Sequence, residues 1–345
     1  MAASEKKQKN AIRFLIVGLG SMGKRRIRNL QYLGETDIIG FDLKEERRKE
    51  SEEKYHIKTF GEINQALAEK PDAMIISTPP QFLIEYELLA AKQKKNFFSE
   101  AGVFIEGHKE LQKIVKANKI IAVPSSTFRF NISVQKIKEL IDQKSIGKTV
   151  AVTYHMGQYA LSWHPWEDIN ESYLGQKDSA GPRKGIPFEF GWLTWVFGDI
   201  KEISCIKGKI SNLDADIDDV YQLLIQFENG AIGNVVTEVV SRAPLRVLRV
   251  VGEEGTIVWD WLEGKVKIYE TKTKKWTEYK EDKGFKEKGY LAKENMYIDE
   301  IKNFLNIIRK KEKQVYTLGE EYDILKLVKY AEESAEKKKI IEIKK

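Results

Sequence analysis

The chain has 345 residues, of which 42% are hydrophobic and 32% charged, and its formal net charge is +6. This length allows two domains with separate cores. No apolar run approaches the roughly 20 residues of a membrane-spanning helix, and lysine alternates with glutamate along most of the chain, which is typical of a solvated surface rather than a nucleic-acid footprint.

The N-terminal residues 1–10 are polar and lack the apolar segment of a signal peptide, so we expect a disordered lead-in there. Cys205 is the single cysteine, which rules out an intramolecular disulfide and fits a reducing cytoplasm. We expect it to be a small buried residue on a strand. The prediction is a cytoplasmic protein without a metal, a membrane or a nucleic acid as partner.

A glycine-rich turn follows the first predicted strand. Residues 12–17 are mostly apolar and are followed by glycines spaced G-x-G-x-x-G, after which residues 24–33 suit an amphipathic helix. In a dinucleotide-binding turn the first glycine permits the bend, the second lets backbone approach the pyrophosphate, and the third allows close helix packing. The N–H groups at the helix start then hold the phosphates. The residues predicted to do so are Gly18, Gly20, Ser21, Met22 and Gly23.

The second predicted strand ends in Asp42. This residue lies 19 positions after Gly23 (42 − 23), close to the separation of about 20 expected for a carboxylate on the adenosine ribose hydroxyls. Such a carboxylate repels a 2′-phosphate, so we predict NAD as the cofactor. Lys44, Arg47 and Arg48 follow closely, which leaves NADP open.

Strand and helix patterns alternate through the first 125 or so residues. Helices are predicted at 44–54, 62–69, 82–92 and 107–117, and strands at 57–60, 73–78, 96–100 and 120–123. Strands separated by helices form a parallel sheet covered on both faces, so residues 11–128 are predicted to be an α/β Rossmann domain. Ligands of such sheets lie at the carboxyl ends of the strands. The rim shared with the glycine turn is therefore predicted to include Ser77, Thr78, Pro79 and Glu100.

From about residue 129 the hydrophobic pattern changes to a period of two. Strands are predicted at 149–156, 200–210, 220–227, 232–240, 245–251, 256–261 and 265–269, and helices at 131–143, 293–310 and 319–336. Turns at 228–230 and 253–255 suit antiparallel hairpins. We predict an α+β domain at 129–345 with a large, mostly antiparallel, open-faced sheet and helices on one face; its last helix could pack back on the first domain.

A resemblance to a known family rests on the glycine turn, Asp42, residues 77–80, the segment Phe128-Arg129-Phe130-Asn131, and residues 297–335. These stretches resemble the glucose–fructose oxidoreductase / inositol dehydrogenase (Gfo/Idh/MocA-like) superfamily over nearly the whole chain. The resemblance implies a Rossmann domain joined to an open-faced sheet domain, with NAD or NADP acting on a sugar, cyclitol or nucleotide-linked sugar. It also implies a homodimer or homotetramer formed through the sheet face, and a cofactor- or interface-facing role for Arg129.

Two stretches depart from the pattern of that family. The family's strand equivalent to residues 97–100 continues as Glu-Lys-Pro, with the lysine at the hydroxyl of the reacting carbon, whereas this chain reads Glu100-Ala101-Gly102. The family's His-x-x-Asp stretch corresponds here to Phe188 and Gly191. Both usual proton-handling groups are therefore missing.

Two residues are candidates to replace them, since a positioned base typically contributes about 10²–10⁴-fold to the rate. His164, in an aromatic irregular segment, could exchange a proton near neutral pH, or be a packed loop histidine. Glu189, in an apolar stretch, would be desolvated with a raised pKa, as a general base requires. It could instead form an ion pair, with Arg183 or Lys184 as partner.

Other side chains are candidates for binding. Trp166 offers a flat face for the nicotinamide or for a sugar ring, or could be core packing, and Glu167 and Asp168 could bind sugar hydroxyls or cap a helix. Arg183 could meet an anionic substrate, such as a sugar phosphate or nucleotide sugar, or lie solvated in a loop. Tyr154 could line the same cavity.

Three functions follow from these residues. The favoured one is an NAD(P)-dependent oxidoreductase acting on a sugar, cyclitol or nucleotide-sugar derivative, with the base relocated to His164 or Glu189. The second is a catalytically silent NAD(P)-binding protein. The third is a redox-neutral lyase or hydrolase that uses bound NAD transiently.

Overall fold

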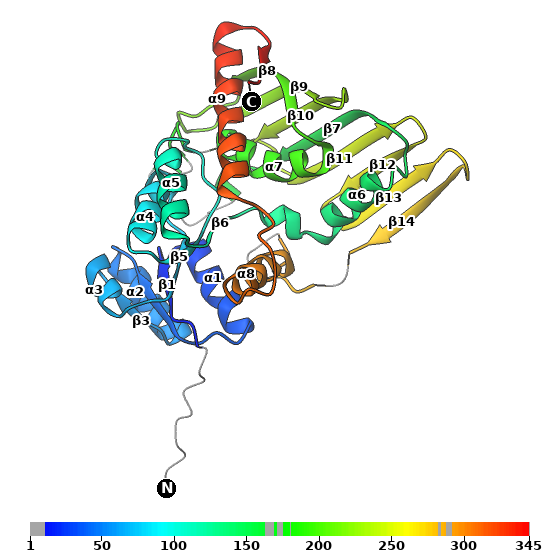
Figure 1. Cartoon of the computed structure of the whole chain (residues 1–345). Coiled ribbons are helices and arrows are strands. Elements are labelled where there is room, and N and C mark those ends of the chain that lie inside the picture. The colour runs from blue at the N-terminus through cyan, green and yellow to red at the C-terminus, as the bar shows by residue number, and fades with distance from the viewer. Residues whose placement is uncertain are drawn as a thin grey trace. The chain divides into compact units, whose positions relative to one another are not determined.

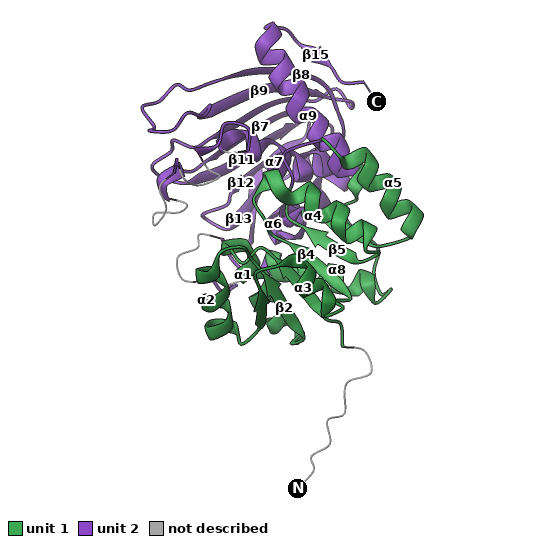
Figure 2. Cartoon of the chain, turned by 90° about the vertical axis from the view of Figure 1, so that its left-hand side faces the viewer, with its two compact units in different colours: residues 1–101, 106–125, 297–319 green, residues 102–105, 126–296, 320–345 purple. Residues whose placement is uncertain are grey.

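A computed structural model describes residues 11–162, 169–170, 175–179, 181–281, 284–287 and 292–344. The chain forms two compact units that interleave along the sequence (Figure 2). Unit 1 comprises residues 1–101, 106–125 and 297–319, and unit 2 comprises residues 102–105, 126–296 and 320–345. A segment from near the C-terminus therefore completes the first unit.

Unit 1 is built on a six-stranded parallel sheet. Its strands are β1 (Phe14–Val17), β2 (Ile38–Phe41), β3 (Lys58–Phe60), β4 (Ala73–Ile76), β5 (Asn96–Ser99) and β6 (Ala122–Pro124). They lie in the order β3-β2-β1-β4-β5-β6, and every neighbouring pair is parallel. This is the strand order of a dinucleotide-binding Rossmann fold, which confirms the predicted class.

Helices cover both faces of this sheet because its strands are apolar at successive positions. Phe14 and Ile16 face a core that includes residues of α1 (Ser21–Tyr32), α2 (Glu45–Tyr55) and α8 (Asn295–Ile308). Leu15 and Val17 face the opposite core, with α3 (Ile63–Ala68), α4 (Pro80–Lys92) and α5 (His108–Asn118). Because all the strands are parallel and each is followed by a helix, the turns from strand to helix all lie at the carboxyl ends of the strands.

Unit 2 is built on a nine-stranded sheet with the order β14-β13-β12-β11-β7-β10-β9-β8-β15. Its strands are β7 (Thr149–Gly157), β8 (Ile200–Gly208), β9 (Val220–Phe227), β10 (Ile232–Glu238), β11 (Leu245–Gly252), β12 (Gly255–Asp260), β13 (Lys265–Glu270), β14 (Lys275–Lys280) and β15 (Ile341–Glu342). Only the pair β7–β10 is parallel among these neighbours. The prediction of a large, mostly antiparallel sheet is confirmed.

One face of this sheet is covered and the other is open. The covering helices are α6 (Ile132–Asp142), α7 (Gly181–Phe197) and α9 (Leu318–Lys337) (Figure 1). Their side chains share a core with alternate residues of the strands. The opposite parity leaves Ile206, Leu224 and Ile232 exposed by 78%, 56% and 59%. Cys205, next to Ile206, points into the core, and its burial raises the pKa of the thiol to about 12, so it is the small buried strand residue that was predicted.

Three of these α-helices and strands were not predicted from the sequence, and one of them is the two-residue strand β15. Helix α7 contains Pro187 within its length, and strand β14 is a charged, largely exposed edge. None of the helices in the described ranges combines the length and the apolarity needed to cross a bilayer.

Candidate functional site

The bend between β1 and α1 depends on two glycines that cannot carry a side chain. Gly18 has φ +90°, and a Cβ there would lie 2.8 Å from the carbonyl oxygen of Ser77. A Cβ on Gly23 would lie 1.8 Å from the carbonyl oxygen of Gly18. The first glycine therefore makes the turn and the third lets the helix approach the strand, as expected of a dinucleotide turn.

Gly20 lies in a more open place, directly before α1. A Cβ on Gly20 would meet only the guanidinium of Arg47, whose Nη1 is 3.6 Å away. Gly20 is the N-cap of a 12-residue helix that has no side-chain cap and no acidic residue in its first turn. Backbone N–H groups and the positive end of the helix dipole are therefore directed to this space, which suits a pyrophosphate.

Asp42 follows β2 and stabilises the glycine turn. Its carboxylate accepts hydrogen bonds from the backbone N–H of Leu19 (2.7 Å) and of Lys44 (2.9 Å). The Nη1 of Arg47 lies 3.7 Å from Asp42 Oδ2. Each carboxylate oxygen accepts more than one hydrogen bond, so Asp42 retains capacity for ribose hydroxyls beside the turn.

Residues after β4 and β5 complete this rim of unit 1. The backbone N–H of Ser77 donates to Val17 O (2.8 Å), and the Ser77 hydroxyl donates to Glu100 Oε1 (3.3 Å). Thr78 Oγ1 is buried and has no hydrogen-bond partner among the described residues. A buried hydroxyl without a partner is costly, and a bound ligand would supply one. Pro79 occupies the N-cap position of α4 without a side-chain capping bond. The predicted rim residues Ser77, Thr78, Pro79 and Glu100 thus all lie just after β4 and β5 in unit 1.

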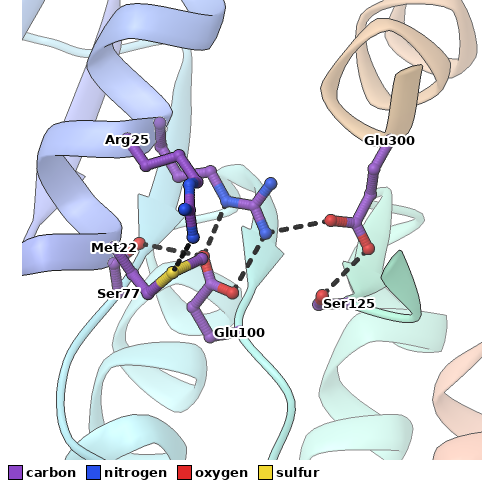
Figure 3. Close-up of polar contacts among 7 residues, drawn as sticks. Met22, Arg25, Ser77, Glu100, Ser125 and Glu300 are labelled. Carbon is purple, nitrogen blue, oxygen red and sulfur yellow. Dashed lines mark hydrogen bonds and ion pairs between the residues drawn. The ribbon is translucent and has the colours of Figure 1, made fainter. Parts of the chain in front are cut away.

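A buried charge cluster lies behind this rim (Figure 3). Arg26 of α1 is fully buried and donates from Nε to Glu100 Oε1 (2.7 Å) and from Nη2 to Glu100 Oε2 (3.0 Å). The same Nη2 donates to Glu300 Oε2 (2.9 Å), and Ser125 Oγ donates to Glu300 Oε1 (2.9 Å). Burial alone would lower the pKa of Arg26, but the two carboxylates raise it above its ordinary value. Glu100 is therefore anchored to the unit 1 core.

Glu300 gives this cluster a pH dependence. Burial raises its pKa, against the influence of Arg26, and Glu100 raises it further. A carboxyl whose pKa is higher in the folded than in the unfolded chain contributes full stability at low pH and loses it as pH rises through the folded pKa.

We therefore expect Glu300→Gln, which cannot ionise, to become more stable relative to the wild type as pH rises above the ordinary pKa of a glutamate and through the raised pKa of Glu300. Urea unfolding at several pH values measures this. A stability difference that does not change with pH would contradict the assignment.

A second polar cluster is enclosed in the aromatic core of unit 2. Glu189 of α7 is completely buried, and its Oε2 accepts from the Tyr154 hydroxyl (2.5 Å) and from Trp192 Nε1 (2.8 Å). Its Oε1 accepts from Arg246 Nη2 (2.7 Å), while Arg246 Nε donates to the Tyr154 hydroxyl (2.9 Å). The ion pair weighed from the sequence thus exists, with Arg246 of β11 as the partner in place of Arg183. Burial and Glu189 raise the pKa of Tyr154 well above its ordinary value, so its hydroxyl stays protonated.

The surroundings of Glu189 hold its side chain in place. Three donors occupy its carboxylate, and it has no exposed surface. Tyr154 is also fully buried, which removes it from direct contact with a solvent-borne substrate. Phe188 is the residue that the family resemblance places where the histidine is expected. Its ring packs edge-on against Phe128, with the ring centroids 5.5 Å apart.

The other predicted residues of unit 2 have protein partners. Arg129 is buried and donates to Gly191 O (2.9 Å) and to Glu320 Oε1 (2.9 Å). Arg183 pairs with Glu332 of α9 at 2.5 Å. Neither contact tests the predicted roles of these arginines toward cofactor or substrate.

Four predicted residues lie outside the described residues: His164, Trp166, Glu167 and Asp168. Among the residues that the structure does describe, no group of three or more His, Cys, Asp or Glu side chains is placed to hold a metal ion.

Arg26, Glu300 and Arg246 were not among the site residues predicted from the sequence. Arg26 and Glu300, which bond to each other, are 274 positions apart in the sequence, and Arg246 and Glu189 are 57 positions apart. The sequence did contain one indication of Arg246. This charged residue lies at an alternate position of β11 with Leu248 and Val250, which are both buried, so its side chain points to the covered face of the sheet.

Two family models match the chain. The model of the oxidoreductase family with an NAD-binding Rossmann fold matches residues 12–124, and the model of the GFO/IDH/MocA C-terminal domain matches residues 134–258. A curated relative, Oxidoreductase P35 of Formosa agariphila, is 25% identical over 164 residues, which are 45% of this chain and 51% of that protein. The chain thus matches about half the length of this relative.

Solved structures share the fold over nearly the whole chain. An oxidoreductase from Agrobacterium radiobacter, in complex with NAD⁺, L-tartaric acid and magnesium, has a TM-score of 0.84 at 14% identity and covers 96% of this chain and 98% of that one. The WlbA dehydrogenase from Bordetella pertussis, with NADH and UDP-GlcNAcA, has a TM-score of 0.79 at 17% identity, covering 97% and 100%. A levoglucosan dehydrogenase with NADH and levoglucosan has a TM-score of 0.84 at 16% identity, covering 97% and 100%. At these identities the likeness shows the fold.

Proposed function

The chain belongs to the GFO/IDH/MocA oxidoreductase family and carries the family's NAD-binding Rossmann fold in unit 1. On that premise, we propose that it transfers a hydride between NAD and a hydroxyl-bearing carbon of a sugar, cyclitol or nucleotide-sugar derivative. The observation that carries this proposal is the rim of unit 1. There the glycine turn, Asp42 and the buried Thr78 hydroxyl converge beside an uncapped helix start.

The residues of this rim fit NAD. Gly18 and Gly23 shape the turn, Gly20 leaves the space before α1 open for a pyrophosphate, and the α1 N-terminus would hold that group. Asp42 is placed for the adenosine ribose hydroxyls and favours NAD over NADP. When bound, NAD supplies the hydride acceptor.

The relatives support the substrate class. WlbA was solved with a nucleotide-linked sugar acid, and the levoglucosan dehydrogenase with an anhydro sugar. A ring that bears several hydroxyl groups is the feature shared by these ligands.

The proton of the reacting hydroxyl needs an acceptor. Ala101 stands at the place of the family lysine, Phe188 stands at that of the histidine, and Glu189 is anchored to Arg246. We therefore retain His164 as the proposed proton acceptor and give Glu189 a positioning role. Trp166, Glu167 and Asp168 remain proposed contacts to the nicotinamide and sugar.

The experiment is a turnover assay on the full chain with NAD or NADP and a panel of sugars, sugar acids, cyclitols and nucleotide sugars. We expect NADH to form with one of these classes, faster with NAD than with NADP. His164→Ala should lower kcat by roughly 10²–10⁴-fold without changing NADH affinity, whereas the exposed His56→Asn serves as a control. Tight NADH binding without turnover on any class would instead favour the silent binding protein.

We also propose that copies of the chain associate through the open face of the unit 2 sheet. Ile206, Leu224 and Ile232 are more than half exposed there, and large exposed apolar side chains on one face favour a protein interface. Sedimentation of the wild type and of Leu224→Lys measures this, and a monomeric wild type would contradict it.

A further inference from the structure

The guanidinium of Arg246 is held rigidly on one side. Its Nε and Nη2 are bonded to Tyr154 and Glu189, both completely buried. Glu189 is fixed in turn by Trp192. A side chain restrained in this way has lost its rotamer freedom before any ligand arrives, which is the condition for a preorganised binding group.

Aromatic rings flank the same guanidinium. Its central carbon lies 4.3 Å from the ring centroid of Phe128 and 5.1 Å from that of Trp261. Both Phe188, which packs on Phe128, and Trp261 are only partly buried. Arg246 therefore lies between the fully buried pair Glu189 and Tyr154 and partly exposed aromatic rings, near the amino end of β11.

The remaining nitrogen of Arg246 faces outward. Nη1 makes no hydrogen bond to any described residue and is not shielded from solvent, and the Arg246 side chain is 12% exposed. Glu189 behind it has no exposure. Two N–H donors are thus presented to solvent beside an indole ring.

Arg26 provides an example in the same chain of a guanidinium that binds more than one anion. One guanidinium there binds two carboxylates, those of Glu100 and Glu300. Arg246 binds a single carboxylate from the protein. The ion pair with Glu189 does not prevent a second anion from binding, because the planar guanidinium offers donors on more than one edge.

We propose that Arg246 binds the anionic group of the substrate, a carboxylate or a phosphate, through Nη1, with Trp261 beside it to cover the face of the sugar ring. This inference rests on the proposed function and narrows it to acidic derivatives of sugars. A guanidinium is the side chain best suited to carboxylate and phosphate oxygens.

The test uses three probes that share one ring: D-glucose, D-glucuronate and D-glucose 6-phosphate. Each is titrated by calorimetry into the full chain saturated with NAD. We expect D-glucuronate or D-glucose 6-phosphate to bind at least roughly ten-fold more tightly than D-glucose, the effect of a charge-assisted hydrogen bond. The anion that gains affinity identifies carboxylate or phosphate as the recognised group.

Arg246→Lys is the test variant. It keeps a cation against Glu189, so that no buried carboxylate is left unpaired, but loses the outward donors. We expect it to reduce the preference for the anion to within about two-fold. Arg249 lies on the same strand with an exposed side chain, so the control variant Arg249→Lys should keep the preference for the anion. An unchanged affinity for NADH shows that each variant is folded.

Three results would overturn this inference: equal binding of the neutral and anionic probes, no binding of any probe, or an anion preference that survives in Arg246→Lys. Its failure is distinct from failure of the proposed function. Turnover on neutral sugars without an anion preference removes only the role of Arg246, whereas anion binding without turnover on any class removes the oxidoreductase.

Discussion

Gly23→Ala is expected to destabilise unit 1 and to abolish NADH binding. The new methyl carbon would lie 1.8 Å from the carbonyl oxygen of Gly18, well inside any contact that real atoms adopt. The clashing atom belongs to the backbone, which cannot turn aside, so helix α1 must move away from β1. Overpacking of a well-packed interior costs about 1–3 kcal/mol and more where the backbone must shift, and the displaced helix would no longer hold the phosphates.

Gly20→Ala is the matched control for this prediction. Its methyl group would meet only a flexible guanidinium at 3.6 Å, so we expect wild-type stability. NADH affinity should nevertheless fall, because the same methyl group enters the space for the pyrophosphate. Urea unfolding and calorimetric titration separate the two effects. Wild-type stability in Gly23→Ala, or wild-type NADH affinity in Gly20→Ala, would contradict this account of the turn.

Arg26→Met is expected to cost about 3–5 kcal/mol of unfolding free energy, the loss typical of breaking a buried charge cluster from one side. The guanidinium of Arg26 is fully buried and is the cation bonded to both Glu100 and Glu300. Without it, two carboxyl groups would share an interior site, and one of them would have to take up a proton on folding.

Two comparisons sharpen this result. Adding Glu300→Gln to Arg26→Met should recover part of the loss, because one buried charge is removed. Lys49→Met, which breaks an exposed pair with Glu45, should leave the unfolding transition unchanged. An Arg26→Met variant as stable as the wild type would show that the cluster does not stabilise unit 1.

The sequence predicted unit 1 well because its signals are local. Strands β1, β2 and β5 are short runs rich in apolar residues, followed directly by Gly18, Asp42 and Glu100, and the functional turn is contiguous from Gly18 to Gly23. Asp42 is also local, since its position follows from the length of one helix and one strand. Its hydrogen bond to the Leu19 N–H confirms that the end of β2 lies beside the glycine turn.

Helix α7 was not predicted because its sequence disfavours a helix. It contains Pro182, Pro187 and three glycines, which cost helix stability in isolation. Packing decides the conformation: a Cβ on Gly185 would lie 3.2 Å from Met156 and 3.3 Å from Thr237. The small residue allows the helix to lie close to the sheet, and this tertiary gain outweighs the low propensity.

The polar clusters could not be predicted because they depend on register and tertiary pairing. Arg183 and Glu189 lie six residues apart on α7, a spacing that does not bring side chains together on a helix, but helix α7 was not predicted. That Glu189 meets Arg246 depends on the position of α7 over β7 and β11, which sequence spacing does not reveal. Arg246 is placed by its pairing with Met156 across the β11–β7 ladder. A one-residue slip in that ladder would turn its side chain to the open face of the sheet.

Equilibrium titration of NADH into the purified full chain measures whether the glycine turn of unit 1 holds the cofactor. We expect one NADH per chain, bound more tightly than NADPH, and a lower affinity in Gly20→Ala. The absence of binding by either nucleotide, or NADH binding that Gly20→Ala leaves unchanged, would contradict the assignment of the cofactor to this turn.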